Sequence, residues 1–321
     1  MTSCIVTIDE RMDDACAQAL VAQGYTLCRL PSYHRLPVPV ASHPDMLLLP
    51  VRGRLFCYEE YLSMYTHRLT ELAETAGLVL CPLSIRPSDT YPADIAMNFC
   101  SVGRYLIGRQ DCLPPDIAAL FSPGERLQAR QGYARCAGCP VGTQALITAD
   151  ASLARAASAA GLDVLRLSEH SATLEGYSTG FFGGACGADN VRRLLFFCGQ
   201  WEALPEAAAI RAFCLSHGYT PISLSPFPLY DYGSLLFFKK VKRCSLLRPA
   251  RRARLKKTPF AFKQHERGCE KPDVFHSPSS ISVGMPAWGY KFGRGYPCLG
   301  FAGFLVAKRR RFSAEDRTFY S

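Results

Sequence analysis

Acidic and thiol side chains stand just ahead of several short apolar runs, and the first such motif is SHPDM at residues 42–46. Pro44 fixes its own φ and restricts the residue before it, so His43 and Asp45 are held at the entrance of an expected strand. A carboxylate in that position can form two parallel hydrogen bonds with a guanidinium group. The alternative is that Asp45 caps backbone N–H groups within the turn.

Two further motifs place a carboxylate before an expected strand. In YPADIAMN, residues 91–98, Asp94 precedes the strand much as Asp45 does, and Asn98 closes the apolar stretch. In LYDYGS, residues 229–234, Asp231 supplies a third carboxylate. Carboxylates delivered from neighbouring structural units suit a cation that carries several N–H donors. The structural alternative for YPADIAMN is a turn aspartate followed by an edge asparagine.

Three cysteines are candidates for nucleophilic chemistry: Cys136 and Cys139 in CAGC, and Cys186 in GFFGGACG. A single C-x-x-C pair lacks the four ligands of a structural zinc site, and the strand expected after it disfavours a thioredoxin-like use. We therefore expect no metal and no cofactor. Two interpretations stay open, namely a nucleophilic or substrate-contacting thiol with His43 as a further catalytic candidate, or small residues in tight turns. The glycines of GFFGGACG indicate either close approach of a ligand to the backbone or crowding of the chain.

The elements that must position these residues repeat along the chain. A helix-like segment ends at a glycine and turns directly into a short apolar strand at Gly24, Gly77, Gly161 and Gly218, with a weaker copy at Gly124. Glycine adopts the left-handed conformation at a helix C-terminus without steric cost. Successive glycines are 53, 47, 37 and 57 residues apart. Repeats of this length indicate modules that bury their faces against one another.

Polar loops and further strands follow each junction, which defines five strand–strand–helix–strand units. The N-terminal segment SCIVTID, residues 3–9, supplies the missing strand of the fifth unit. We expect an α/β fold, a five-bladed pseudo-symmetric α/β propeller whose helices lie outside and whose polar loops converge at one end of a central axis. The alternative is an open doubly wound sheet, but the glycine fingerprint of such nucleotide-binding sheets is missing after the first strand.

The charge distribution divides the chain in two. Residues 239–321 contain 20 basic and 5 acidic side chains, which leaves 17 basic and 22 acidic side chains in residues 1–238. We expect a folded domain over 1–238 and a basic extension over 239–321 that is largely disordered, such as a read-through of the reading frame. A mildly acidic domain is not expected to bind nucleic acid, although the extension is a candidate for binding a polyanion.

Cellular location follows from what the sequence contains. The sequence contains no run of about 18 uncharged apolar residues, so we expect no membrane span. The acidic start MTSCIVTIDERMDD is unlike a signal peptide. The 15 cysteines are odd in number and scattered through apolar strands, which indicates reduced thiols. These features predict a cytoplasmic protein with no membrane partner.

The five units, and the order of SHPDM, YPADIAMN, GYARCAGC, GFFGGACG and LYDYGSLL, resemble the pentein superfamily of guanidino-group-modifying enzymes, which includes deiminases and amidinotransferases. The motifs look most like an uncharacterised bacterial branch of that superfamily, and the resemblance covers about residues 1–238. It implies an axial funnel in which carboxylates bind a cationic guanidine. It also implies a cysteine that attacks the guanidine carbon and a histidine that transfers protons.

The sequence departs from those enzymes in its fifth unit. Their nucleophilic cysteine belongs there, but this chain has Asp231, Gly233 and Ser234 instead, and a serine without a paired base is a poor nucleophile. Two functions therefore stay open for the acidic axial pocket: modification of a small guanidino or amidino compound, or binding of a small cationic metabolite without catalysis. A scaffold that recruits partners through its basic extension is a third alternative. The sequence does not decide the oligomeric state.

Overall fold

The computed structural model describes residues 4–168 and 172–241. The basic extension predicted from residue 239 onward therefore lies almost entirely outside the described residues. The prediction that this extension is disordered concerns the same residues and stays a prediction. Within the described part, no helix is long and apolar enough to cross a membrane.

Fifteen strands form five separate three-stranded sheets in the described residues. The elements of the first unit are η1 (Val38–Val40), α2 (Pro44–Leu47), β3 (Leu48–Val51), β4 (Arg54–Tyr58), α3 (Glu59–Met64), α4 (Thr66–Ala76) and β5 (Val79–Leu83). Those of the second are β6 (Cys100–Val102), β7 (Tyr105–Gly108), η2 (Gln110–Cys112), α5 (Pro115–Ala118), η3 (Pro123–Glu125) and β8 (Arg126–Gln128).

The remaining units follow the same plan. The third has α6 (Ala134–Ala137), β9 (Gly138–Val141), β10 (Ala145–Thr148), α7 (Ala151–Ala159) and β11 (Asp163–Arg166). The fourth has η4 (Gly183–Ala185), β12 (Cys186–Asp189), β13 (Leu194–Phe197), η5 (Trp201–Ala203), α8 (Ala207–Ser216) and β14 (Thr220–Ser223). The fifth joins the two ends of the described chain, with β15 (Leu236–Lys239), β1 (Cys4–Asp9), α1 (Asp14–Ala22) and β2 (Tyr25–Leu30).

Every sheet has the same hydrogen-bonding order. An inner strand pairs antiparallel with a middle strand, and the middle strand pairs parallel with an outer strand that follows a crossover segment, as in β3–β4–β5. In the fifth unit, β1 pairs antiparallel with β15 and parallel with β2, so the N-terminal strand completes this unit as predicted. The prediction of five strand–strand–helix–strand units is confirmed, and the open doubly wound sheet is excluded.

Glycine conformation explains four of the five helix-to-strand junctions. Gly24, Gly77, Gly161 and Gly218 have φ between +67° and +86°, the left-handed region that ends a helix and redirects the chain. Gly124 differs, because it lies inside η3 and not at the end of a helix. The prediction of a fifth junction of this kind at Gly124 is therefore wrong. The second unit instead reaches its outer strand through α5 and a 3-10 turn.

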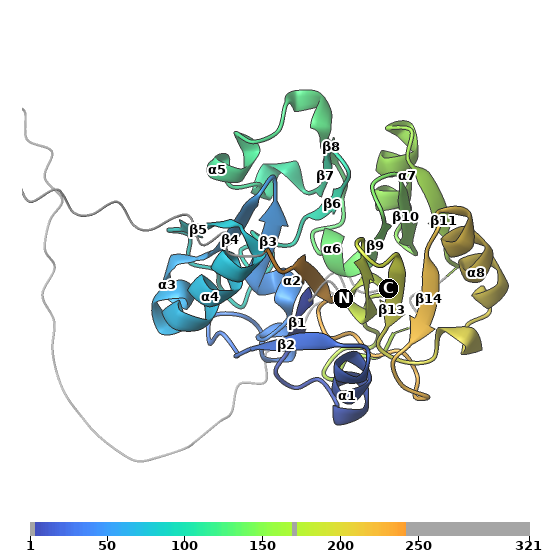
Figure 1. Ribbon diagram of the computed structural model, residues 1–321. Helices are drawn as coiled ribbons and strands as arrows, with labels where there is room; N and C mark the ends of the chain where they lie inside the picture. Colours follow the sequence, from blue (N-terminus) through green and yellow to red (C-terminus); the bar gives the residue numbers. More distant parts are fainter. Residues whose placement is uncertain (1–3, 169–171, 242–321) are drawn as a thin grey trace, which may run out of the picture. The chain divides into compact units, whose positions relative to one another are not determined.

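The five sheets lie around a common centre, with α1, α4, α7 and α8 on the outside (Figure 1). The middle strands are almost wholly buried because the crossover helices cover them, and the inner strands face the centre. Neighbouring inner strands contact one another from β6 through β9 and β12 to β15. The five sheets stay separate from one another. Because the inner strands face the centre, the loops that lead into these strands meet there.

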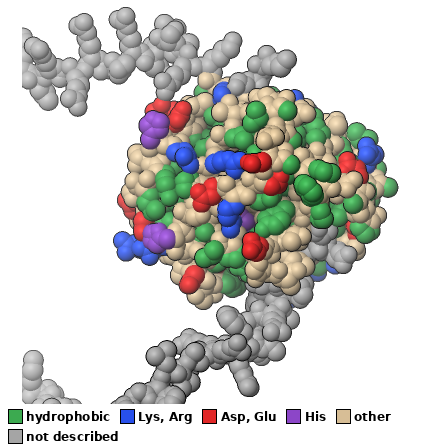
Figure 2. Space-filling view, turned by 90° about the horizontal axis from the view of Figure 1, so that it is seen from below, with side chains coloured by type: hydrophobic (Ala, Val, Ile, Leu, Met, Phe, Trp, Pro, Cys, Tyr) green, Lys and Arg blue, Asp and Glu red, His purple; other side chains and the backbone are tan. Residues whose placement is uncertain are grey.

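The face of the domain drawn in Figure 2 has no continuous basic stripe among its described residues. On the face shown in Figure 2, Lys and Arg side chains are interspersed with Asp and Glu. A nucleic-acid footprint is expected to be a continuous basic stripe instead. At the other boundary, ordered pairing continues past residue 238, since Lys239 pairs with Cys4 and the Val241 N–H donates to the carbonyl of Thr75.

A buried hydrogen bond between the fifth and fourth units provides a test of how the units hold together. The Tyr25 hydroxyl donates to Asp189 Oδ2 at 2.6 Å, and both residues are buried. Tyr25→Phe should lower the free energy of unfolding by about 1.5–3 kcal/mol, because it removes a buried hydrogen bond to a carboxylate. Urea unfolding measures this change. Tyr65→Phe is the control, since its hydroxyl makes no hydrogen bond within the described residues, and equal losses in both variants would contradict the assignment.

Candidate functional site

Three of the predicted site residues, His43, Asp45 and Cys136, lie on or next to short helical turns that lead into inner strands. His43 is the N-cap of α2, Pro44 is its first residue, and Asp45 lies in its first turn, where the sequence analysis expected the entrance of a strand. The Asp45 N–H donates to the carbonyl of Gly233, which ties the first unit to the fifth. Cys136 lies on α6, the equivalent turn of the third unit. The repeated architecture therefore brings these turns to the centre.

The carboxylate of Asp45 lies at the centre of the site and contacts side chains of two other units. Both of its oxygens lie 3.2 Å from Cys136 Sγ, which can donate its thiol hydrogen to either. Ser234 Oγ lies 2.6 Å from Asp45 Oδ2 and 3.0 Å from the carbonyl oxygen of Gly183. These side chains are each at most 2% exposed. One carboxylate thus connects side chains from the first, third and fifth units in a space closed to solvent.

Asn98 of the second unit fixes the position of Cys136. Its Oδ1 accepts hydrogen bonds from the backbone N–H groups of Arg135 and Cys136, at 2.8 and 3.2 Å. Its Nδ2 lies 3.0 Å from Cys136 Sγ and 3.3 Å from the carbonyl oxygen of Asp45. Asn98 is therefore a positioning residue for α6, which explains why a buried amide is needed at the end of YPADIAMN.

His43 lies between two further carboxylates. Its Nε2 is 3.7 Å from Asp9 Oδ2, and its Nδ1 is 3.9 Å from Asp231 Oδ1. Within the described part of the chain, neither ring nitrogen has a hydrogen-bond partner, although the residue is only 1% exposed. Asp231 is held by the backbone N–H groups of Phe181 and Gly233. Asp9 is held by Arg11 and by the hydroxyl of Ser42.

Burial sets the protonation of the site. It raises the pKa of Asp231 to about 6, with His43 opposing the shift and the charge of Asp45 adding to it. Burial, and then the charge of Asp45, hold the pKa of the Cys136 thiol well above its usual range. Asp9 is different, because hydrogen bonds from Arg11 and the nearby His43 outweigh the effect of burial and lower its pKa. Cys136 is therefore a protonated thiol at neutral pH.

Other predicted residues occupy different places. Asp94 accepts a hydrogen bond from the Tyr133 hydroxyl at 2.5 Å, its Oδ1 has no partner in the described residues, and burial raises its pKa. Cys139 and Cys186 lie on the inner strands β9 and β12, buried in the core and interacting with each other. Their hydrogen bonds reach backbone carbonyls nearby, so they pack as small core residues.

Sequence reasoning missed two members of the site. Asp9 ends β1 and was noted only as part of an acidic segment, and Ser234 was treated only as a replacement for cysteine. Ser234 has φ of +68°, a conformation that a non-glycine residue holds only where its surroundings enforce it. The equivalent positions of different units, at the ends of inner and middle strands, were the available signal for both.

A cavity lies between the inner strands, apart from these residues. It has a volume of about 570 Å³ and runs along the inner strands and their turns, without Asp45, Asp231 or His43 in its lining. Its charged lining residues are Arg52, Arg135 and Lys239, so it is basic. A cation therefore does not fit this cavity. The acidic cluster, which we define as Asp9, His43, Asp45, Cys136, Asp231 and Ser234, is a separate site.

The arrangement of the five units and the match to a family model relate this chain to known proteins. Five strand–strand–helix–strand units around a centre are the pentein-like arrangement that the sequence resemblance implied. The chain belongs to a family described as a family of unknown function, DUF6873, whose sequence model matches residues 7–236. A search of the curated proteins found no match.

Solved structures with a similar course of the chain include SxtG, an amidinotransferase from Microseira wollei in the saxitoxin biosynthetic pathway. It is 10% identical, with a TM-score of 0.43, over 76% of this chain and 96% of that chain. AgrE in complex with L-arginine is 9% identical, with a TM-score of 0.44, over 76% of this chain and 41% of that chain. Similarity at this level transfers no activity to the chain.

Glycines close the site by crowding. A Cβ atom on Gly233 would lie 2.1 Å from His43 Cβ, and one on Gly184 would lie 1.9 Å from Asp231 Oδ1. No heavy atom can approach so closely, so both positions need glycine. Of the two interpretations of GFFGGACG, the geometry favours crowding of the chain at the centre.

Gly233→Ala should destabilise the protein by displacing His43. Its φ of +71° strains any side chain, and the collision with His43 adds an overpacking cost of about 1–3 kcal/mol. Gly218→Ala is the matched control, with φ of +74° and no atom within 4 Å of the added Cβ. Denaturant unfolding should show a clearly larger loss for Gly233→Ala, and equal losses would mean that the centre relaxes around the methyl group.

Proposed function

We propose that the protein binds a small guanidino or amidino cation through Asp45 and Asp231. The observation that carries this proposal is the burial of both carboxylates without an Arg or Lys ion pair in the described residues. Arg135, beside Cys136 in the chain, donates to the carbonyl oxygens of Gly138 and Gly183 instead of to a carboxylate. The pentein resemblance supports the same class of ligand.

The physical argument is one of charge compensation. A buried carboxylate is costly unless it is paired, protonated or bound to a cation. Asp9 has its partner in Arg11, whereas Asp231 has, among the residues that the structure describes, only His43 within ion-pair distance. A guanidinium group offers five N–H donors in a planar fork that matches carboxylate oxygens. A ligand of this kind stabilises the ionised forms of both aspartates together.

Ligand binding requires a local opening. Asp45 and Asp231 are each 1% exposed, and the loops that carry Phe181 and Gly233 cover the second of them. These loops must therefore open locally before a ligand reaches the carboxylates, as ligand-binding segments commonly do. We therefore expect slow association that accelerates with temperature, because the loops must move before the cation reaches its carboxylates.

Thermal unfolding with arginine, agmatine and methylguanidine tests the proposed ligand class. A ligand at 100 times its Kd should stabilise the protein by about 2.7 kcal/mol, and each kcal/mol raises Tm by about 2–4 °C. Asp45→Asn should abolish this shift because it removes the charge but keeps the side-chain shape. Asp163→Asn, at an exposed aspartate, is the control and should retain it. The proposal fails if no guanidino or amidino compound shifts Tm in the wild-type protein.

A second candidate function, modification of the bound cation, is favoured by the contact between Cys136 Sγ and Asp45. Asp45 can accept the thiol proton while the sulfur attacks the guanidine carbon, and the same proton can then pass to the amine that leaves as the C–N bond breaks. Water that attacks the S-linked carbon would release a urea-type product and return the proton to the sulfur. The raised pKa of Cys136 opposes this reaction until a cationic ligand compensates the nearby charge. Binding alone is therefore the primary proposal.

Cys136→Ala separates the two functions. If modification occurs, the variant should retain the ligand-induced rise in Tm but lose turnover to below about one-thousandth of the wild-type rate. Release of ammonia or of a urea-type product is the measurement. Cys214→Ala, at a buried cysteine on α8, is the matched control. Absence of turnover in the wild-type protein would restrict the function to binding.

A further inference from the structure

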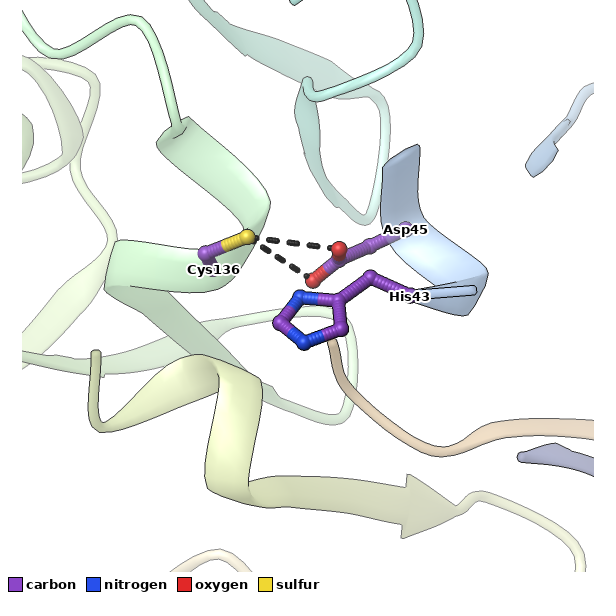
Figure 3. A group of neighbouring side chains, drawn as sticks. All are labelled: His43, Asp45 and Cys136. Atoms are coloured by element: carbon purple, nitrogen blue, oxygen red, sulfur yellow. Dashed lines mark hydrogen bonds between the residues drawn. The ribbon is translucent and has the colours of Figure 1, made fainter. Parts of the chain in front are cut away.

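Three side chains of the acidic cluster have the composition of a metal site. His43, Asp45 and Cys136 each offer a ligand atom, and these atoms all lie within 4.8 Å of one another. Figure 3 shows a ring nitrogen of His43 directed toward the carboxylate of Asp45 and toward Cys136 Sγ. The three residues come from α2 and α6, so they meet only in the folded chain.

The unpartnered histidine is an independent indication of a ligand. Both ring nitrogens of His43 are buried without a hydrogen-bond partner in the described residues. Leaving a buried polar group unpaired costs about 1–3 kcal/mol, so native structures normally satisfy such groups. Asp9 lies 3.7 Å from Nε2, which leaves Nδ1 to face Asp45 and Cys136. A bound cation at Nδ1 satisfies the histidine and compensates the aspartates.

We propose that His43, Asp45 and Cys136 bind a single Zn²⁺ ion. A thiolate, an imidazole and a carboxylate form a mixed set that suits Zn²⁺, whereas Mg²⁺ and Ca²⁺ take oxygen ligands. Bond lengths of about 2.0–2.3 Å in a tetrahedral site place ligand atoms about 3.3–3.8 Å apart. The observed spread of 4.8 Å or less therefore closes with small movements of side chains.

The surrounding residues complete the site. Asp231 Oδ1 lies 3.9 Å from His43 Nδ1 and is the candidate fourth ligand. Asp9 is placed to accept a hydrogen bond from the Nε2–H group, the outer-shell contact that orients a metal-binding histidine. Zn²⁺ binds the thiolate, so the proton that Cys136 shares with Asp45 leaves to solvent when the metal enters.

This inference rests on the geometry of the cluster and not on the guanidino ligand. Zn²⁺ and a guanidinium group both need the carboxylate of Asp45, so each should exclude the other. Zinc then acts as a competitor of the proposed ligand, and the thermal shift caused by arginine-like compounds should shrink when zinc is present. Thermal unfolding with EDTA and with ZnCl₂ compares the two states directly.

The test loads the full-length protein with ZnCl₂, removes free metal by gel filtration and measures zinc by mass spectrometry. Wild-type protein should retain one zinc ion per chain, and Cys136→Ala should lower the affinity in chelator competition by about 100-fold or more, since even outer-shell partners contribute 10–100-fold. Cys214→Ala is the matched control and should bind as wild type. His43→Gln should weaken binding, whereas His217→Gln should not.

A measurement on the wild-type protein covers the case in which Cys136→Ala fails to fold. Co²⁺ loaded in place of zinc should give an intense ultraviolet thiolate-to-cobalt band together with the visible bands of a tetrahedral site. Absence of that band, or no retained zinc, overturns the proposal, and so does full retention of zinc by folded Cys136→Ala. Zinc binding without any guanidino-induced shift in either state would reject only the proposed function, and a shift without zinc binding would reject only the metal site.

Discussion

The burial of the Asp45 carboxylate is the constraint on which the centre of this protein depends. It contacts the thiol of Cys136, the hydroxyl of Ser234 and, through its backbone, the carbonyl of Gly233. An ionised carboxylate in such a place is stable only when donors or cations surround it. Three of the five units must therefore keep their register with one another for this one side chain to be accommodated.

The repeated architecture fixes the register between the units by packing them tightly around Asp45. The first, third and fourth units each place a short helical turn ahead of the inner strand, and glycines at positions 183, 184 and 233 leave no space for a Cβ atom. The tight packing holds His43 and Asp231 close together, although their ring nitrogen and carboxylate oxygen are 3.9 Å apart, beyond hydrogen-bond distance. A centre that is closely packed, but in which the described residues give His43 no hydrogen-bond partner, is typical of a ligand-binding site.

The cluster differs from the site that the pentein resemblance implies. The fifth unit contributes Ser234 and Asp231 in place of a cysteine, and the thiol at the centre comes from the third unit. Pseudo-symmetry makes such an exchange possible, because equivalent turns of different units approach the same point. The chemistry changes nonetheless, since a thiol with a raised pKa beside a carboxylate and an unpaired imidazole serves better as a ligand than as an activated nucleophile.

The sequence by itself determined the units of the fold. Four glycine junctions, the alternation of helix and strand, and the use of the N-terminal strand in the fifth unit are local or pattern-based features, and each has its cause within a few residues. The exception, Gly124, shows the limit, because a short α5 and a 3-10 turn replaced the expected helix end there. Asp45, Asn98, Asp231 and Cys136 could be named as polar residues ahead of strands.

Only the tertiary structure decided which of those residues meet. Cys136 is 91 residues from Asp45 and Ser234 is 189 residues from it, and no periodicity in the chain encodes those contacts. Asp94 precedes its inner strand much as Asp45 does, yet it accepts a hydrogen bond from the Tyr133 hydroxyl and lies apart from Asp45. The loss of hydrogen bonds at His43 and the burial of three carboxylates arise from packing between units, which depends on all five units at once.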